Sequence, residues 1–63
     1  MKVNLDRLSD LLGRRKMTFA FLSKVAGVRR DALKELFETG NGNGRTLKKI
    51  AKYFGITTED LIQ

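Results

Sequence analysis

Apolar residues recur along the chain in short stretches that have the spacing of a helix face. The clearest stretch is a set of leucines, Leu5, Leu8, Leu11 and Leu12. Such spacing places the side chains on one side of an α-helix, where they can pack against a core. The same spacing predicts five short helices, at residues 5–15, 19–26, about 29–38, 47–54 and, for the last, from Thr57 onwards. No stretch alternates strictly enough to compete as a strand, so the pattern predicts an all-α fold.

Polar residues that can cap a helix stand before four of these five stretches. They are Asn4, Thr18, Thr46 and Thr57. The side-chain oxygen of such a residue accepts a hydrogen bond from a free amide of the first turn. The third helix differs, because Arg29 holds its cap position, has no acceptor oxygen and opposes the helix macrodipole. A helix start that is less stable than it need be is typical of a functional surface.

A tight turn separates the second and third predicted helices. It runs only from Gly27 to about Arg29, which is too short for an antiparallel hairpin of long helices and fits two helices that cross at a steep angle. One helix can then lie across a phosphate backbone while the next enters the major groove of duplex DNA. Residues 39–44, in contrast, have the glycines of a flexible loop.

The charge of the chain is concentrated in its middle. The net charge is +6, and residues 14–52 contain 11 lysines and arginines against only Asp31, Glu35 and Glu38. A basic middle on so small a chain favours a polyanionic partner such as nucleic acid. The alternative is a well-solvated surface that keeps the protein soluble.

The composition excludes several classes of function. The chain has no cysteine and no histidine, so disulfides, thiolate sites and zinc sites are not expected. The glycines at residues 40–44 are not followed by Lys-Ser or Lys-Thr, so they do not form a phosphate-cradling loop. We therefore expect no enzyme, no metal, no cofactor and no small-molecule substrate. No apolar run approaches the length of a membrane span, and the N-terminus does not resemble a signal peptide. We expect a cytoplasmic protein with no membrane partner.

Taken together, the motifs resemble the Cro/repressor (lambda-repressor-like) helix-turn-helix family. The resemblance rests on Met17-Thr18, Leu22-Ser23, Gly27-Val28, Leu33, Leu36, Thr46-Leu47, Ile50-Ala51, Phe54-Gly55-Ile56 and Leu61. It covers about residues 4–62, and it implies a compact five-helix fold in a single DNA-binding domain over residues 1–63. It also implies a transcriptional regulator, repressor-like, that binds a specific duplex sequence, with a homodimer on a palindromic operator.

The resemblance also assigns roles to individual positions. The third helix would be the recognition helix, and the residues that face base edges would be Arg29, Arg30, Asp31 and Lys34. An arginine suits guanine, and Asp31 either accepts a hydrogen bond from cytosine or orients an arginine. The alternative is that Asp31 pairs with Lys34 on a solvated face.

Phosphate contacts are expected on either side of that helix. The resemblance places two of them at Thr18 and Arg45, and the polar side of the fourth helix adds Lys48 and Lys49. Helix N-termini are good phosphate sites because their free amides point outward.

The second helix carries more apolar residues than one inward face can use. Phe19, Phe21 and Val25 form this excess, and the family often has a glutamine where this chain has Phe19. Either one phenylalanine folds back onto the third helix or the core, or these residues form a dimer contact or a surface for a protein partner. The alternative function is therefore a protein-interaction or engineered domain of the same fold in which DNA binding is lost or altered.

Overall fold

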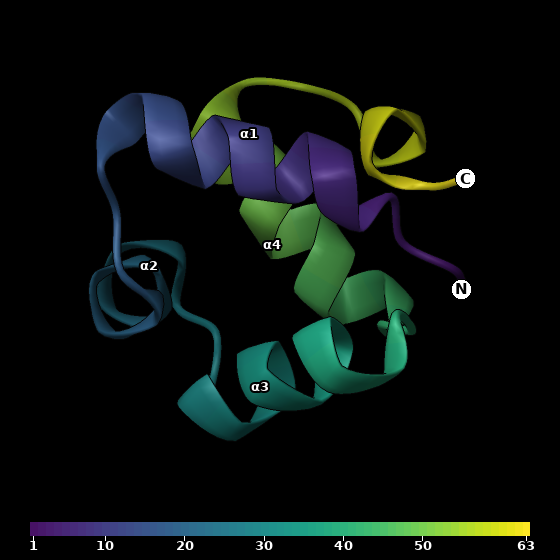
Figure 1. Ribbon diagram of the computed structural model, residues 1–63, viewed down its shortest axis with the longest axis horizontal. Helices are drawn as coiled ribbons and strands as arrows, with labels where there is room; N and C mark the ends of the chain where they lie inside the picture. Colours follow the sequence, from purple (N-terminus) through teal and green to yellow (C-terminus); the bar gives the residue numbers. More distant parts are fainter.

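The computed structural model describes all 63 residues and contains four α-helices followed by a 3-10 helix (Figure 1). The elements are α1 (Leu5–Arg15), α2 (Phe19–Ala26), α3 (Arg30–Thr39), α4 (Gly44–Phe54) and η1 (Thr58–Leu61). The predicted all-α fold is confirmed. The last predicted helix is a 3-10 helix because it has only four residues and closes i to i+3 hydrogen bonds, as short helical pieces commonly do. None of these helices has both the length and the apolar character needed to cross a membrane.

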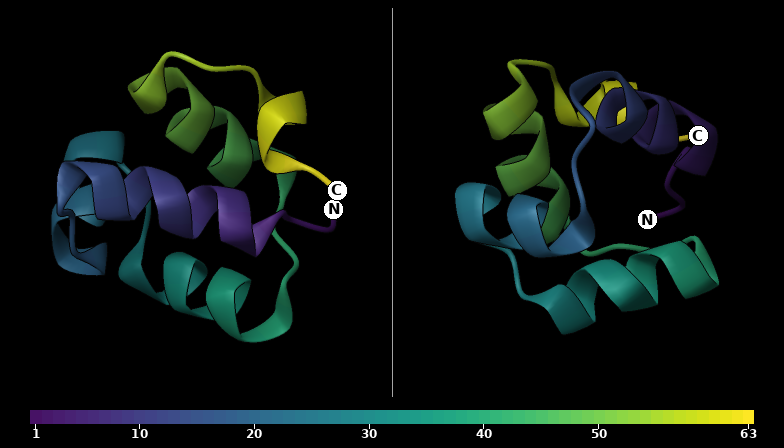
Figure 2. Two further views of the ribbon diagram at one scale, coloured as in Figure 1. Left: turned by 45° about the horizontal axis from the view of Figure 1, so that its top comes forward. Right: turned by 60° about the vertical axis from the view of Figure 1, so that its left-hand side comes forward.

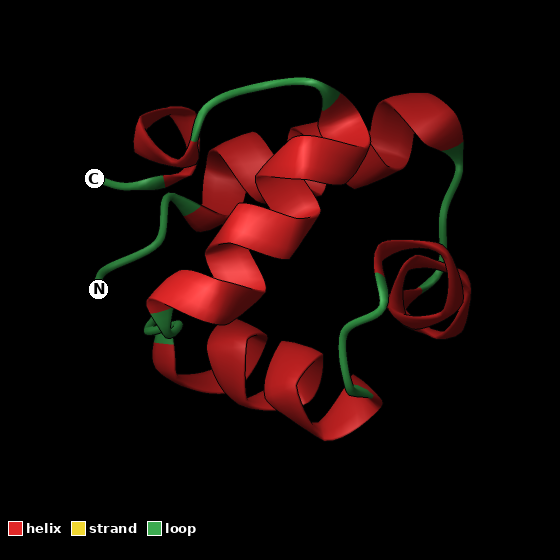
Figure 3. Cartoon of the chain, turned by 180° about the vertical axis from the view of Figure 1, so that it is seen from behind, coloured by secondary structure: helices red, strands yellow, loops and turns green.

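The helices surround a core that is rich in leucine. Each of the five elements supplies at least one of its buried apolar residues, which are Val3, Leu8, Leu12, Leu22, Val28, Leu33, Leu36, Leu47, Ile50, Ala51, Phe54 and Leu61. In Figure 1, α1 runs along the top, α3 along the bottom and α2 lies at the left. Figure 3 shows the molecule from behind, with α4 in front of α1. Burial of this cluster is the main force that holds the short helices together, since helices of this length are marginal in isolation.

The N-terminal segment has a structural role that the apolar pattern did not predict. Val3 is buried and forms an isolated antiparallel bridge with Ile62, and Lys2 forms another with Asn41. The amide of Val3 donates to the carbonyl of Gly40 at 2.8 Å. The segment therefore joins the connection between α3 and α4 to the end of the chain (Figure 2), and the amide of Gln63 donates to the carbonyl of Lys2 at 3.1 Å.

The start of α4 differs from the prediction. Thr46 does not cap this helix; Asn43 does, and its side-chain oxygen accepts from the amide of Thr46 at 2.8 Å. Thr46 lies in the first turn and is only 8% exposed. Gly44 and Arg45 belong to the helix, because Asn43 satisfies the amide of Thr46 and the helix therefore begins after Asn43.

The connection from α3 to α4 is shorter than the flexible loop predicted at residues 39–44. Gly40 ends α3 with φ of +74°, in the left-handed region that favours glycine. Gly42 packs closely against α3, since a Cβ at this position would lie 2.9 Å from a methyl carbon of Leu36. Its amide donates to the carbonyl of Met1 at 3.0 Å. The connection is therefore held by the N-terminal segment and by the core.

Candidate nucleic-acid interface

The predicted tight turn between α2 and α3 is present, and it is closed by local hydrogen bonds. Gly27 has φ of +70°, and the amides of Gly27 and Val28 both donate to the carbonyl of Ser23 at 3.1 Å. The hydroxyl of Ser23 donates back to the carbonyl of Val28. In Figure 1, α2 is seen nearly end-on while α3 lies across the view. The two helices thus cross steeply, as a helix-turn-helix motif requires.

The outer face of α3 lies along one edge of the molecule, where no other element covers it (Figures 1 and 2). Its inner face is formed by Leu33 and Leu36, which are buried. The four residues predicted to face base edges, Arg29, Arg30, Asp31 and Lys34, are all exposed. The fold therefore brings these side chains together at the N-terminal half of one free helix.

The N-terminus of α3 has no side-chain cap. Arg29 occupies the cap position in an extended conformation, and its side chain accepts no hydrogen bond. The free amides of the first turn, together with the helix macrodipole, make this end attractive to anions. Asp31 lies in that first turn, and no ion pair joins it to Lys34. The one ion pair of the chain links Arg14 to Asp10.

A second group of cations lies on α4. Its members are spaced along the helix and line a shallow hollow of about 420 Å³; they are Arg45, Lys48, Lys49 and Lys52. An adjoining hollow of about 400 Å³ is lined by Arg45 and Lys49 together with Arg29 from the start of α3. Arg29, which precedes α3, thus meets two cations of α4 at one hollow.

Lys49 has a structural contact that the sequence did not reveal. Its ammonium group donates to the carbonyl of Gly27 at 3.2 Å. This bond ties α4 to the turn of the helix-turn-helix motif. No sequence signal could have identified it, since the two residues are 22 positions apart and only the packing of α4 brings them together.

Thr18 and Phe19 lie at the start of α2. Thr18 is exposed and caps the helix, and its hydroxyl oxygen accepts from the amide of Phe21 at 3.1 Å. The ring of Phe19 packs on Phe37 of α3, with the ring centroids 4.7 Å apart. Phe19 is thus the phenylalanine that folds back onto α3, although it stays 39% exposed; Phe21 and Val25 are 50% and 36% exposed.

The basic residues at the end of α1 are engaged within the molecule. Arg14 pairs with Asp10 at 3.0 Å, and the guanidinium of Arg15 lies 5.6 Å and 5.0 Å from the ring centroids of Tyr53 and Phe54. Cation–π contacts of this kind are favourable at the edge of a core. Arg15 therefore joins the end of α1 to α4, whereas the pair of Arg14 and Asp10 lies within α1.

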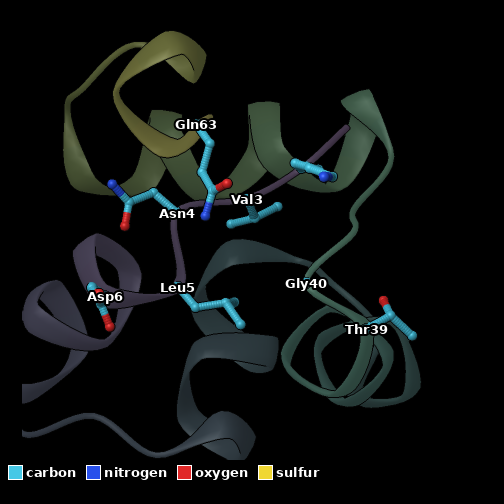
Figure 4. Close-up of a pocket in the computed structure, with 8 residues that line it drawn as sticks. Val3, Asn4, Leu5, Asp6, Thr39, Gly40 and Gln63 are labelled. Atoms are coloured by element: carbon cyan, nitrogen blue, oxygen red, sulfur yellow. The ribbon is translucent and has the colours of Figure 1, made fainter.

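A separate polar hollow of about 370 Å³ lies where the chain termini meet the end of α3 (Figure 4). Its walls include Asn4, Asp6, Thr39 and Gln63. Asp6 and Lys2 are its only charged side chains. It lies at the opposite end of α3 from Arg29, and so it is separate from the hollow that Arg29 lines.

The comparison with known proteins agrees with this geometry. A family model of the Cro/C1-type HTH DNA-binding domain matches residues 7–63. No curated protein and no solved structure matches the chain. The family match includes both helices of the motif, the turn between them and the α4 residues that support it. The chain therefore belongs to the Cro/C1-type helix-turn-helix DNA-binding family.

Proposed function

We propose that this protein is a repressor-like transcriptional regulator that recognises a specific duplex sequence with α3 in the major groove. The observation that carries the proposal is the N-terminal half of α3. It is uncovered, and the cations of Arg29, Arg30 and Lys34 are exposed and take part in no ion pair. Exposed cations on the second helix of such a motif are positioned to contact base edges, whose readout confers specificity.

Arg30 and Lys34 are the central base-reading residues of this proposal. They are four positions apart, about one turn, so their side chains project from the same side of α3 about 6 Å apart along its axis. That separation corresponds to about two base pairs. Arginine and lysine are the side chains that most often contact guanine O6 and N7. Arg29, at the helix start, extends the reading surface toward the adjoining phosphate or base.

Phosphate contacts would flank the reading helix. Arg45, Lys48 and Lys49 are exposed at the N-terminal half of α4. The hollow that Arg45 and Lys49 share with Arg29 supports one phosphate-binding side. Thr18, at the N-terminus of α2, supports the other. Such contacts set the register of a protein on DNA and supply sequence-independent affinity.

A homodimer on a palindromic site is part of the proposal. The Cα trace extends over 23 × 22 × 18 Å. Successive major grooves on one face of DNA are about 34 Å apart, so one copy covers about one half-site. Two copies related by a twofold axis would read both halves.

The test is a selection from a random duplex library, followed by anisotropy titrations at two salt concentrations. Sequence-specific binding with a steep salt dependence is expected, because phosphate contacts release counterions. Arg30→Ala should relax preference at one position of the selected site. Lys48→Ala should weaken binding to all sequences alike and lower the salt slope by about one. An unchanged selected site for Arg30→Ala would show that α3 is not the reading helix.

A second candidate function is a protein-interaction module. It is favoured by Phe21 and Val25, which are exposed on α2, and by Phe19, which stays 39% exposed although its ring packs on Phe37. Exposed apolar groups that lie together often mark a protein contact. In this case the wild type would bind DNA weakly and without sequence preference, and Phe21→Lys would abolish self-association in sedimentation experiments. Normal operator binding by a monomeric Phe21→Lys protein would count against it.

A further inference from the structure

We infer that Asp31 is a specificity-determining residue that selects cytosine in the operator while lowering the affinity of the protein for DNA in general. The inference rests on the proposed function, because it assumes that α3 enters the major groove. It adds a chemical class of target, namely a half-site that is rich in G·C pairs. It also states that the carboxylate of Asp31 lowers the general affinity for DNA, which the surrounding cations raise.

The position of Asp31 on α3 carries the first step. An α-helix turns by about 100° per residue, so Leu33 and Leu36, which are buried, define the inward direction. Asp31 then lies almost directly opposite the core. It is exposed, it is in the first turn, and its carboxylate takes part in no ion pair or hydrogen bond. A recognition helix contacts bases mainly through its N-terminal residues, so Asp31 would face the floor of the groove.

The chemistry of the carboxylate carries the second step. An ionised aspartate has acceptor atoms only. In the major groove guanine presents two acceptors and thymine one, whereas cytosine presents a donor, the N4 amino group. Adenine offers a donor beside the N7 acceptor, which would repel the carboxylate. Asp31 therefore gains a hydrogen bond at cytosine and is left desolvated and unpaired at guanine or thymine.

The remaining polar residues of α3 fit the same target. Arg30 and Lys34 suit the acceptors of guanine, and the helix contains no asparagine or glutamine, the side chains that pair with adenine. From Arg30 to Thr39, α3 carries two basic and three acidic residues. Its charge thus contributes little to general attraction for phosphate. That attraction would come from Arg45 and its neighbours on α4, while α3 selects the sequence.

The experiment compares Asp31→Asn with a matched control, Glu38→Gln. Glu38 is exposed on the same side of α3 but about 10 Å further along the axis, in the last turn. Each variant removes one negative charge from the same helix face. Both variants would be used in the selection from the random duplex library. Their binding to selected and to random duplexes would then be titrated, and thermal melting would verify that each variant is folded.

The wild type is expected to select a half-site that is rich in G·C pairs. Asp31→Asn should bind random duplex about 3–10-fold more tightly, because one phosphate-repelling charge is removed. Its ratio of specific to random affinity should fall by about tenfold, with cytosine lost or replaced by adenine at one position. Glu38→Gln should tighten binding to both duplexes alike and keep the selected site.

Three results would overturn the inference and leave the proposed function intact: an A·T-rich site selected by the wild type, retention of cytosine at every position by Asp31→Asn, or weaker binding of that variant to all DNA. The last would mean that Asp31 orients an arginine. Absence of any sequence preference in the wild type would instead refute the proposed function itself.

Discussion

Arg29 is the one cap residue of the four α-helices that gives its helix no side-chain hydrogen bond. It is the cap residue of α3, yet its side chain accepts no hydrogen bond from the first turn. Asn4, Thr18 and Asn43 cap the other α-helices through side-chain oxygens. The charge of Arg29 also opposes the macrodipole of α3. An arginine at this position is accounted for if its guanidinium contacts DNA.

We predict that Arg29→Ser stabilises the protein and weakens its binding to DNA. A serine oxygen can accept from the first turn, which should raise the free energy of unfolding by about 1 kcal/mol and the melting temperature by roughly 4–8 °C. Thermal melting measures the first effect, and anisotropy titration measures the loss of one phosphate or base contact. Arg30→Ser is the control, because Arg30 is already the first residue of α3 and a serine there does not occupy the cap position. A melting temperature that does not rise in Arg29→Ser would contradict the account of the cap.

At the scale of elements, α4 shows why helix boundaries are harder to predict than helix existence. Thr46 has the right chemistry for a cap, and the apolar spacing begins directly after it with Leu47. Asn43 has equivalent chemistry, and a helix that begins after Asn43 is three residues longer than one that begins after Thr46. The decision depends on the path of the connection that precedes α4, which the N-terminal segment holds in place.

Two substitutions distinguish the two caps. Asn43→Ala should lower the free energy of unfolding by about 1 kcal/mol, because it removes the acceptor for the amide of Thr46. Thr46→Val should change it by less than about 0.5 kcal/mol, since the shape is kept and the hydroxyl caps nothing. Urea unfolding followed by circular dichroism provides both values. The reverse order of effects would restore Thr46 as the cap.

At the scale of the whole molecule, stability depends on a contact between segments that are distant in the chain. Val3 is 1% exposed, and its backbone lies between Gly40 and the C-terminal residues. A chain of 63 residues has a total free energy of unfolding on the order of 3–9 kcal/mol. The loss of one such buried anchor is therefore a large fraction of the total.

Val3→Ser is predicted to lower the free energy of unfolding by about 2–4 kcal/mol, because apolar burial is lost and a hydroxyl is buried without a partner. Met1→Ser is the matched control. Its side chain is 60% exposed, so the effect should stay below about 0.5 kcal/mol. Urea midpoints of the two variants measure the difference. If both variants unfold at the same urea concentration as the wild type, the N-terminal segment does not stabilise the fold.

The sequence by itself determined the elements and the family of this protein. The spacing of leucines, the glycine at position 27 and the caps at Asn4 and Thr18 act over one or two helical turns, so their effects can be read locally. The predicted base-edge residues came instead from the resemblance to the family, and the structure shows that Arg29, Arg30, Asp31 and Lys34 are exposed.

Only the tertiary structure decided how those elements meet. The bond from Lys49 to Gly27, the packing of Phe19 on Phe37 and the burial of Val3 join residues between 18 and 59 positions apart in the chain. No local pattern records such pairs, because each depends on the direction in which a whole helix packs. Helix propensity acts within about one turn of the chain. Which of several apolar or basic side chains is buried or makes a contact depends on the space that the other helices leave.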